Sequence, residues 1–409
     1  MDVTRRSFLT QSSAVAWGVG LPAVFQRAAW AAPKSDRPGG EQTVLVVVQL
    51  SGGNDGLNTV IPFRDPVYQK SRPKLRQPAS KVKKINADLA LHPAMQGFAD
   101  LLEKSHLAIV QGVGYPNPNR SHFSSMDIWH KATRSPAQRY GWLGRALPRL
   151  GSSSAAMYIG GGESPLALFS ATGYAPSLTS LADYQMKIGG GNDAEKKRRL
   201  ITNFAAGKPA RNNRILNLVR ETARATYASS EQLRKVARSY ETPVVYPTTG
   251  LGTRLKLVAQ LIDAGVPERI YYTALGGFDT HAAQAGTQTN LLKELSDAVA
   301  AFQKDITHHG HQKRVLVMTF SEFGRRVREN GSGGTDHGTA SQMFLIGDKV
   351  KPGLIGKLPS LTDLDQGDLK FHTDFRSVYA TILKQWLKVN PRQVLGKTYP
   401  QLKLLNKIG

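Results

Sequence analysis

Hydrophobic residues occur along this chain in short uninterrupted runs separated by amphipathic stretches. The runs predict buried strands at residues 43–50, 107–113, 269–275, 314–320 and 342–346. Short runs that are apolar on both faces are typical of strands inside a parallel sheet. Between them, helical spacing of apolar residues predicts helices at residues 94–104, 122–132, 212–240, 255–262, 291–307 and 375–386. The alternation predicts an α/β fold with a doubly wound, mainly parallel central sheet flanked by helices.

The composition is that of a globular protein and limits the chemistry. Of the 409 residues, 40% are hydrophobic, 21% are charged and none is Cys. Disulfides, thiolate metal sites and Cys nucleophiles are therefore excluded. A metal ion bound to this chain must be held by imidazole, carboxylate, amide or hydroxyl groups.

The first thirty residues have the order of an export signal. Arg5 and Arg6 stand in a twin-arginine motif followed by Phe8-Leu9, and an apolar stretch covers residues 11–25. Ala29 and Ala31 are small residues at the positions that a signal peptidase reads. We predict a signal peptide at residues 1–31, transport by the twin-arginine translocase, and a periplasmic or otherwise exported protein. The alternative is an ordinary basic amphipathic N-terminus.

We expect residues 32–409 to form a single domain, because no linker of typical composition interrupts them. Residues 151–250 carry the weakest pattern and are expected to be a peripheral middle portion. No segment after the signal is long and apolar enough to cross a membrane.

The net charge of +24 favours contact with anionic polymers or surfaces. Residues 64–84 hold eight Lys or Arg and one Asp and are expected to form a surface excursion. Nucleic acid is not an expected partner, because no nucleic-acid-binding module is visible and export would remove most such partners.

Polar residues collect where the predicted strands end. In an open parallel sheet these ends gather along one edge and form the usual ligand site. The residues concerned are Asn54, Asp55, Arg120, Ser121, His122, Asp279, His281, Glu322, Arg325, Asp336 and His337.

These residue types point to one or two divalent metals, zinc, manganese, calcium or magnesium. Four carboxylates gathered at one place, those of Asp55, Asp279, Glu322 and Asp336, would repel one another without a cation among them. The imidazole nitrogens of His281 and His337 favour zinc or manganese. Asn54 offers an amide oxygen as a further ligand.

Ser121 is the candidate nucleophile, because a hydroxyl near such ions can lose its proton and attack phosphorus or sulfur. Arg120 and Arg325 are candidates for neutralising the anionic group under attack. Structural alternatives exist: Ser121 is also a good helix cap, Asn54-Asp55-Gly56 a good turn, and Glu322 a partner for Arg325 on the next turn. His122 has the alternative of lying on a helix surface.

The set GGND, NRSHFSSMDIW, GWLGR, GGFDTH, SEFGRR and GTDHG, with the closing TDFRSVYATIL, resembles an exported bacterial family of unknown function, numbered 1501. The likeness runs from Val44 to Trp386. That family resembles the alkaline phosphatase and sulfatase superfamily, α/β hydrolases with metals at strand ends. The resemblance implies metal ligands at Asp55, Asp279, His281, Asp336 and His337 and a nucleophile at Ser121. It leaves the last ligand open between His372 and Asp374.

The resulting hypothesis is an exported metal-dependent hydrolase of phosphate or sulfate esters, acting on an anionic small-molecule or polymer substrate. The alternative is a non-catalytic cell-envelope protein that keeps a phosphatase-like fold and binds anionic surface polymers.

Overall fold

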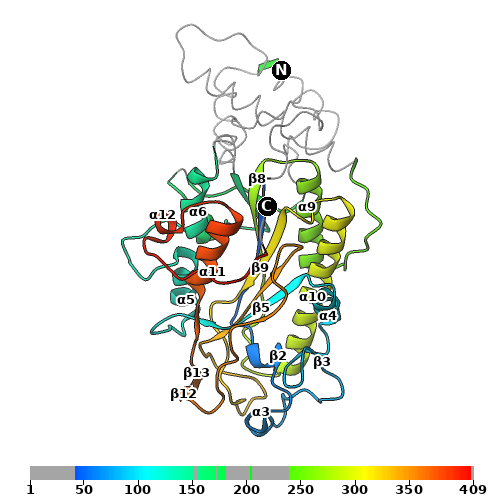
Figure 1. Cartoon of the computed structure of the whole chain (residues 1–409), viewed down its shortest axis with the longest axis vertical. Helices are drawn as coiled ribbons and strands as arrows, with labels where there is room; N and C mark the ends of the chain where they lie inside the picture. The colour runs from blue at the N-terminus through cyan, green and yellow to red at the C-terminus, as the bar shows by residue number, and fades with distance from the viewer. Residues whose placement is uncertain (1–41, 152–154, 172, 181–202, 205–238, 407–409) are drawn as a thin grey trace, which may run out of the picture.

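The computed structural model describes residues 42–151, 155–171, 173–180, 203–204 and 239–406. The predicted signal peptide at residues 1–31 and nearly all of the predicted helix at residues 212–240 lie outside the described residues. Within these limits, Figure 1 shows a central sheet with helices on both sides.

Strand β1 (Val44–Leu50) lies in the middle of a nine-stranded sheet. It pairs in parallel with β8 (Glu268–Leu275) on one side and with β9 (Val315–Phe320) on the other. Beyond β8, the parallel strands β6 (Ala155–Ile159) and β7 (Ser177–Leu178) extend the sheet. Two strands of the predicted middle portion are therefore part of the central sheet.

The other half of the sheet contains its antiparallel strand. Strand β10 (Ser341–Ile346) runs antiparallel to both β9 and β5 (Leu107–Gly114). Two short strands, β11 (Gly353–Ile355) and β14 (Thr373–Asp374), pair in parallel with β5. The predicted mainly parallel, doubly wound sheet is confirmed.

Alternate residues of β1 enter two separate cores. Val46 and Val48 pack in a cluster with the helices α4 (Gln96–Glu103), α9 (Gly250–Asp263) and α10 (Gln284–His308). Leu45 and Val47 face the opposite cluster, which involves α5 (His122–Lys131), α6 (Trp142–Ala146), α11 (Phe375–Thr381) and α12 (Pro391–Leu395). Because both faces are covered, every residue of the strand is buried and all but Gln49 are apolar. Figure 1 shows the two helix layers on opposite sides of the sheet.

Local signals in the sequence begin and end these helices. Thr249 caps α9 by accepting from the backbone N–H of Gly252, and Gly265 follows the helix with a φ of 67°. A π-helical turn, η4 (Ile382–Trp386), continues α11, so the closing helix covers the predicted residues 375–386.

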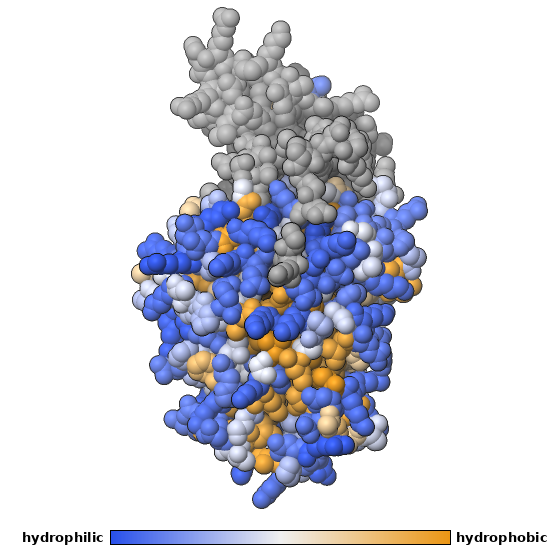
Figure 2. Space-filling model, viewed as in Figure 1, coloured by the Kyte–Doolittle hydropathy of each residue, from blue (hydrophilic) through white to orange (hydrophobic). Residues whose placement is uncertain are grey.

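Smaller elements cover the end of the sheet where its parallel strands terminate. A three-stranded sheet joins β2 (Val60–Ile61), β4 (Ala90–Leu91) and β3 (Lys83–Lys84), and helix α3 (Pro66–Ser71) lies beside it in Figure 1. The remaining short elements are η1 (Gly56–Asn58), η2 (Leu147–Arg149), η3 (Leu166–Leu168), β12 (Leu364–Asp365) and β13 (Asp368–Leu369). Figure 2 shows that hydrophobic residues gather on the lower half of this face, while hydrophilic ones cover its rim.

None of the described helices combines the length and the apolar character needed to cross a membrane.

A buried imidazole in α5 should make the stability depend on pH. His130 bonds through Nε2 to Gln49 Oε1 at 2.9 Å, and burial lowers its pKa from the ordinary 6.5 to about 3. The unfolded chain therefore binds a proton between these values that the folded protein excludes, so stability falls as the pH drops below about 6.5. We expect His130→Gln to remove up to about 1.4 kcal/mol per pH unit of that loss.

Urea unfolding of both proteins between pH 7 and pH 4.5 measures this slope. The exposed His308, changed to Gln, is the matched control and should keep the slope of the parent protein. Equal slopes for the parent protein and His130→Gln would contradict the prediction.

Candidate metal centre

Three loops at the carboxyl ends of β1, β8 and β9 close on one another. Gly52 and Gly53 follow β1 with φ values of 117° and 76°, which side-chain-bearing residues rarely adopt. A Cβ on Gly52 would lie 2.4 Å from the backbone N of Asp279, and one on Gly53 would lie 2.3 Å from the ring of Phe323. Glycine at both positions is therefore required for the three loops to approach this closely.

One carboxylate oxygen, Oδ1 of Asp279, receives contacts from several loops. Arg325 donates to it at 2.7 Å, and Nε2 of His337 and Nε2 of His281 both lie 3.1 Å away. Nε2 of His122, from the first turn of α5, lies 3.4 Å away. Burial opposes ionisation of Asp279, but the hydrogen bond and the positive charge of Arg325 outweigh it and hold its pKa well below the ordinary value. Asp279 is therefore ionised at neutral pH.

His122 is oriented by a buried carboxylate. Its Nδ1 bonds to Oε1 of Glu322 at 2.8 Å, and the same oxygen accepts from the backbone N–H of Gly52 at 2.8 Å. Glu322 is only 2% exposed. Because a carboxylate only accepts, Nδ1 of His122 donates, and in the neutral imidazole the lone pair is then on Nε2, which points to Asp279.

His337 is oriented in the same way by a backbone carbonyl. Its Nδ1 donates to the carbonyl oxygen of Arg120 at 2.7 Å, which leaves the lone pair on Nε2. Burial lowers the pKa of His337, against the opposing effect of the Asp279 carboxylate and the Arg120 carbonyl, which favour the protonated form. The buried ring of Phe323 packs against both imidazoles, with centroids 4.9 Å from His122 and 4.6 Å from His337.

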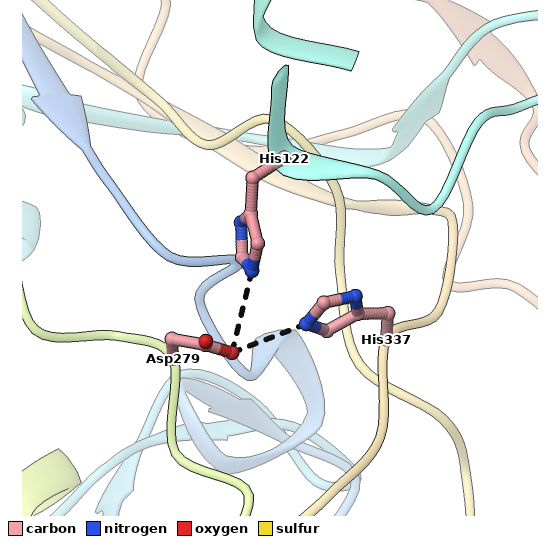
Figure 3. Close-up of side chains that lie close together, drawn as sticks. All are labelled: His122, Asp279 and His337. Carbon is pink, nitrogen blue, oxygen red and sulfur yellow. Dashed lines mark hydrogen bonds and ion pairs between the residues drawn. The ribbon is translucent and has the colours of Figure 1, made fainter. Parts of the chain in front are cut away.

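This arrangement fits a metal ion. Among the described residues, His122, Asp279 and His337 form a group whose ligand atoms lie within 4.8 Å of one another, and Figure 3 shows the two imidazoles pointing at the carboxylate. Nε2 of His122 is buried without a hydrogen-bond partner. A lone pair left in this way, on an imidazole whose other nitrogen is held by a carboxylate, is the usual state of a metal-ligating histidine.

The spacing also suits a small ion. Ligands at zinc distances of about 2.0–2.2 Å in a tetrahedron lie about 3.3–3.6 Å apart. The distances from Asp279 Oδ1 to the imidazole nitrogens are 3.1–3.4 Å. His281 lies at the edge of the group, with Nε2 2.9 Å from Nε2 of His337.

Several of the predicted site residues are brought together here. The carboxylate of Asp279 contacts both His281 and His337. Glu322 bonds to Nδ1 of His122, the nitrogen that faces away from Asp279. Asp336 lies beside His281, with 3.5 Å between Oδ1 and Nδ1. A hydrogen bond from Asn330 lowers the pKa of Asp336. The side chains of Asp279, His281 and Asp336 are 49%, 45% and 56% exposed, so the centre opens to solvent on this side.

Asp55 and Asn54 have other partners. Asp55 is fully buried and pairs with the buried Arg72, while Gln284 donates to the same carboxylate oxygen at 2.5 Å. Oδ1 of Asn54 accepts from Gln288 at 3.0 Å. The structure thus gives the charge of Asp55 a guanidinium partner within the protein, and its assignment as a metal ligand stays a prediction.

The remaining predicted residues surround the centre. Ser121 is exposed at the N-cap of α5 and makes no capping bond with its side chain. The guanidinium of Arg120 pairs with Asp368. Arg325 is buried and also bonds to the carbonyls of Gly52, Gly53, Phe278 and Thr335, so it ties the loops together rather than facing solvent.

The two candidates for a last ligand do not reach this group. His372 is exposed, and both oxygens of Asp374 accept from the side chain of Arg376, at 2.8 Å and 2.5 Å.

Two contributors were not assigned a role from the sequence. The sequence indicates His122 as a strand-end residue and not as a metal ligand. Its place in NRSH at the start of a helix is the signal that could have identified it as a ligand. Arg72 lies in a basic stretch, where nothing in the sequence distinguishes it from the surface cations.

A family model described as "Protein of unknown function (DUF1501)" matches residues 42–399. The chain belongs to the DUF1501 family. The predicted resemblance is therefore confirmed, and the matched range contains every described residue of the centre. Among curated proteins, none matches this member of DUF1501.

Solved structures that resemble this DUF1501 chain include members of the expected superfamily. PsFucS1 sulfatase from Pseudoalteromonas sp. is 12% identical, with 79% of this chain and 66% of that chain covered and a TM-score of 0.36. The lipoteichoic acid synthase LtaP from Listeria monocytogenes is 11% identical, with coverages of 84% and 78% and a TM-score of 0.36. This chain thus spans just under two thirds of that sulfatase, and at these TM-scores the likeness carries no argument about activity.

A third match is described as a protein in the alkaline phosphatase superfamily, from Vibrio parahaemolyticus. It is 8% identical, with 82% of this chain and 70% of that chain covered and a TM-score of 0.37.

The orientation of His122 gives a test of the centre. We expect the protein to bind zinc, and His122→Ala and His337→Ala to abolish that binding. Glu322→Gln should weaken zinc binding about 10–100-fold, because it removes the charged acceptor that orients and polarises the His122 imidazole. Isothermal titration of metal-free protein with zinc measures these affinities.

The control is His308→Ala, an exposed imidazole on α10 that should leave zinc affinity unchanged. Unaltered zinc binding in both His122→Ala and His337→Ala would rule out the centre.

Proposed function

We propose that this protein is an exported metal-dependent hydrolase of phosphate or sulfate esters. One divalent cation would be held by His122, Asp279 and His337, with His281 as a further ligand. The observation that carries the proposal is the pair of imidazole lone pairs aimed at one ionised carboxylate, each fixed by an acceptor on its other nitrogen. A bound cation would supply Lewis-acid stabilisation of the negative charge on the ester oxygens.

The proposed nucleophile is Ser121, which is joined on both sides to residues of the centre. The carbonyl of Arg120 accepts from His337, and the side chain of His122 enters the group itself. The hydroxyl of Ser121 caps nothing and is exposed. Since no side chain caps α5, the first backbone N–H groups of this ten-residue helix stay available to an anionic ester.

The two states of His337 give the proposed site a pH dependence. Its burial-lowered pKa keeps the imidazole neutral, and so able to bind metal, at neutral pH. Acid protonates the imidazole and competes with the ion. Activity and metal affinity should therefore fall together as the pH is lowered.

Export and domain organisation complete the proposal. Export rests on the twin-arginine motif, and a single domain over residues 32–409 is supported by β6 and β7, which join the middle portion to the central sheet. The metal could be zinc, manganese, calcium or magnesium, with zinc or manganese favoured by the imidazoles.

Replacement of Ser121 separates catalysis from metal binding. We expect Ser121→Ala to lower kcat/KM for an aryl phosphate or aryl sulfate by about 10³-fold or more, because the nucleophile is lost. Zinc affinity should stay the same, since Ser121 is not in the ligand group. Hydrolysis of 4-nitrophenyl esters by zinc-loaded protein measures the rates.

The matched control is Ser124→Ala, an exposed serine in the same helix turn. If Ser121→Ala and Ser124→Ala hydrolyse both esters as fast as the parent protein, Ser121 is not the nucleophile.

A further inference from the structure

Exposed cations crowd the segment between β2 and β4. Residues 64–84 contain one acid, Asp65, whose carboxylate caps α3 by accepting from the N–H groups of Val67 and Tyr68. Six cations of this segment are exposed and Lys83 is half-buried; the exposed ones are Arg64, Lys70, Lys74, Arg76, Lys81 and Lys84. We call these seven residues, with the exposed Arg328, the basic surface.

The basic surface is bonded to the loop that holds the metal centre. Arg72 passes inward from this segment and donates to the carbonyls of Val327 and Arg326, at 3.0 Å and 2.9 Å. In the opposite direction, the Glu329 carboxylate accepts from the backbone N–H groups of Lys74 and Leu75. The same loop contains Arg325, whose guanidinium bonds to Asp279.

Figure 1 gives the arrangement on the scale of the molecule. Helix α3 lies at the lower end, with strands β2 and β3 side by side above it, and this is the end toward which β1 runs from the top of the sheet. The basic surface and the candidate metal centre therefore belong to the same end of the molecule.

The charge of the basic surface lacks a partner in its own segment. The carboxylate of Asp65 is used by the α3 backbone, and that of Glu329 is used by the backbone at Lys74 and Leu75. Like charges gathered in this way repel one another, and a polyanion that lies across them relieves the repulsion and is drawn in from a distance.

The aromatic residues of the segment distinguish between polyanions. Proteins that bind single-stranded nucleic acid stack bases on exposed aromatic side chains. Phe63 and Tyr68, within or next to this segment, are buried. Among the described residues, the exposed large hydrophobic side chains lie elsewhere, at Phe123, Tyr140, Tyr174 and Val245. A chain recognised through its charge alone suits the basic surface better than one recognised through its bases.

We infer that the basic surface is a docking site for a sulfated or phosphorylated polysaccharide, one ester group of which enters the metal centre while its neighbours contact the cations. This inference rests on the proposed function for the identity of the group that is cleaved, but the docking itself requires no turnover. The partner is therefore a polymeric substrate, and the basic surface increases its local concentration at the centre.

Binding of dextran sulfate to the full-length, zinc-loaded protein tests the inference. The triple variant Lys74→Glu/Lys81→Glu/Lys84→Glu should bind it about tenfold more weakly, or worse, at low ionic strength. The control Lys384→Glu/Lys397→Glu/Lys403→Glu changes the net charge equally at exposed positions on and after η4, and should bind like the parent protein. Uncharged dextran should bind to none of them, and added salt should weaken the parent's binding.

The outcomes separate docking from catalysis. Loss of dextran sulfate binding in the first triple variant alone supports the docking site, whether or not the protein hydrolyses an ester. Absence of hydrolysis would count against the proposed function only. Equal loss in both triple variants would show attraction to net charge only and overturn the inference, as would absence of binding by the parent protein. A short single-stranded oligonucleotide that binds more tightly than dextran sulfate, and depends on the same lysines, would overturn the choice of polysaccharide.

Discussion

The site depends on the ionised carboxylate of Asp279. One of its oxygens is shared by a guanidinium from the loop after β9, imidazoles from α5 and from the loop before β10, and a further imidazole two residues along its own loop. Without that negative charge the nitrogens would have no common point. Their convergence follows from the sheet, because parallel strands deliver their loops to one edge.

Much of the fold could be predicted because both faces of the sheet are covered. Strands such as β1 and β9 are buried at every position and apolar at all but one, Gln49 and Thr319, which makes them recognisable without knowledge of their neighbours. The start of helix α10 was harder to predict: the helix begins at Gln284 and not near residue 291. Its first turns bury Gln284 and Gln288 to bond Asp55 and Asn54, and buried amides resemble surface residues in a sequence.

The site could be predicted in part for a related reason. Asp279, His281 and His337 follow from strand ends and residue chemistry, whereas their partners depend on three-dimensional packing. Nothing in the sequence indicates that Glu322 bonds to His122, 200 residues away, or that Arg72 neutralises Asp55. Four carboxylates were expected to need a shared cation, but the folded chain supplies guanidinium, imidazole and amide partners to most of them.

The role of Arg325 bears on how the centre would respond to acid. Its guanidinium donates to carbonyls of three loops, those after β1 and β8 and the one before β10. Backbone carbonyls do not titrate, whereas the imidazole of His337 does. A brief fall in pH would therefore release an ion held there while the bonds that join the loops persist, and a return to neutral solution would let the ion bind again.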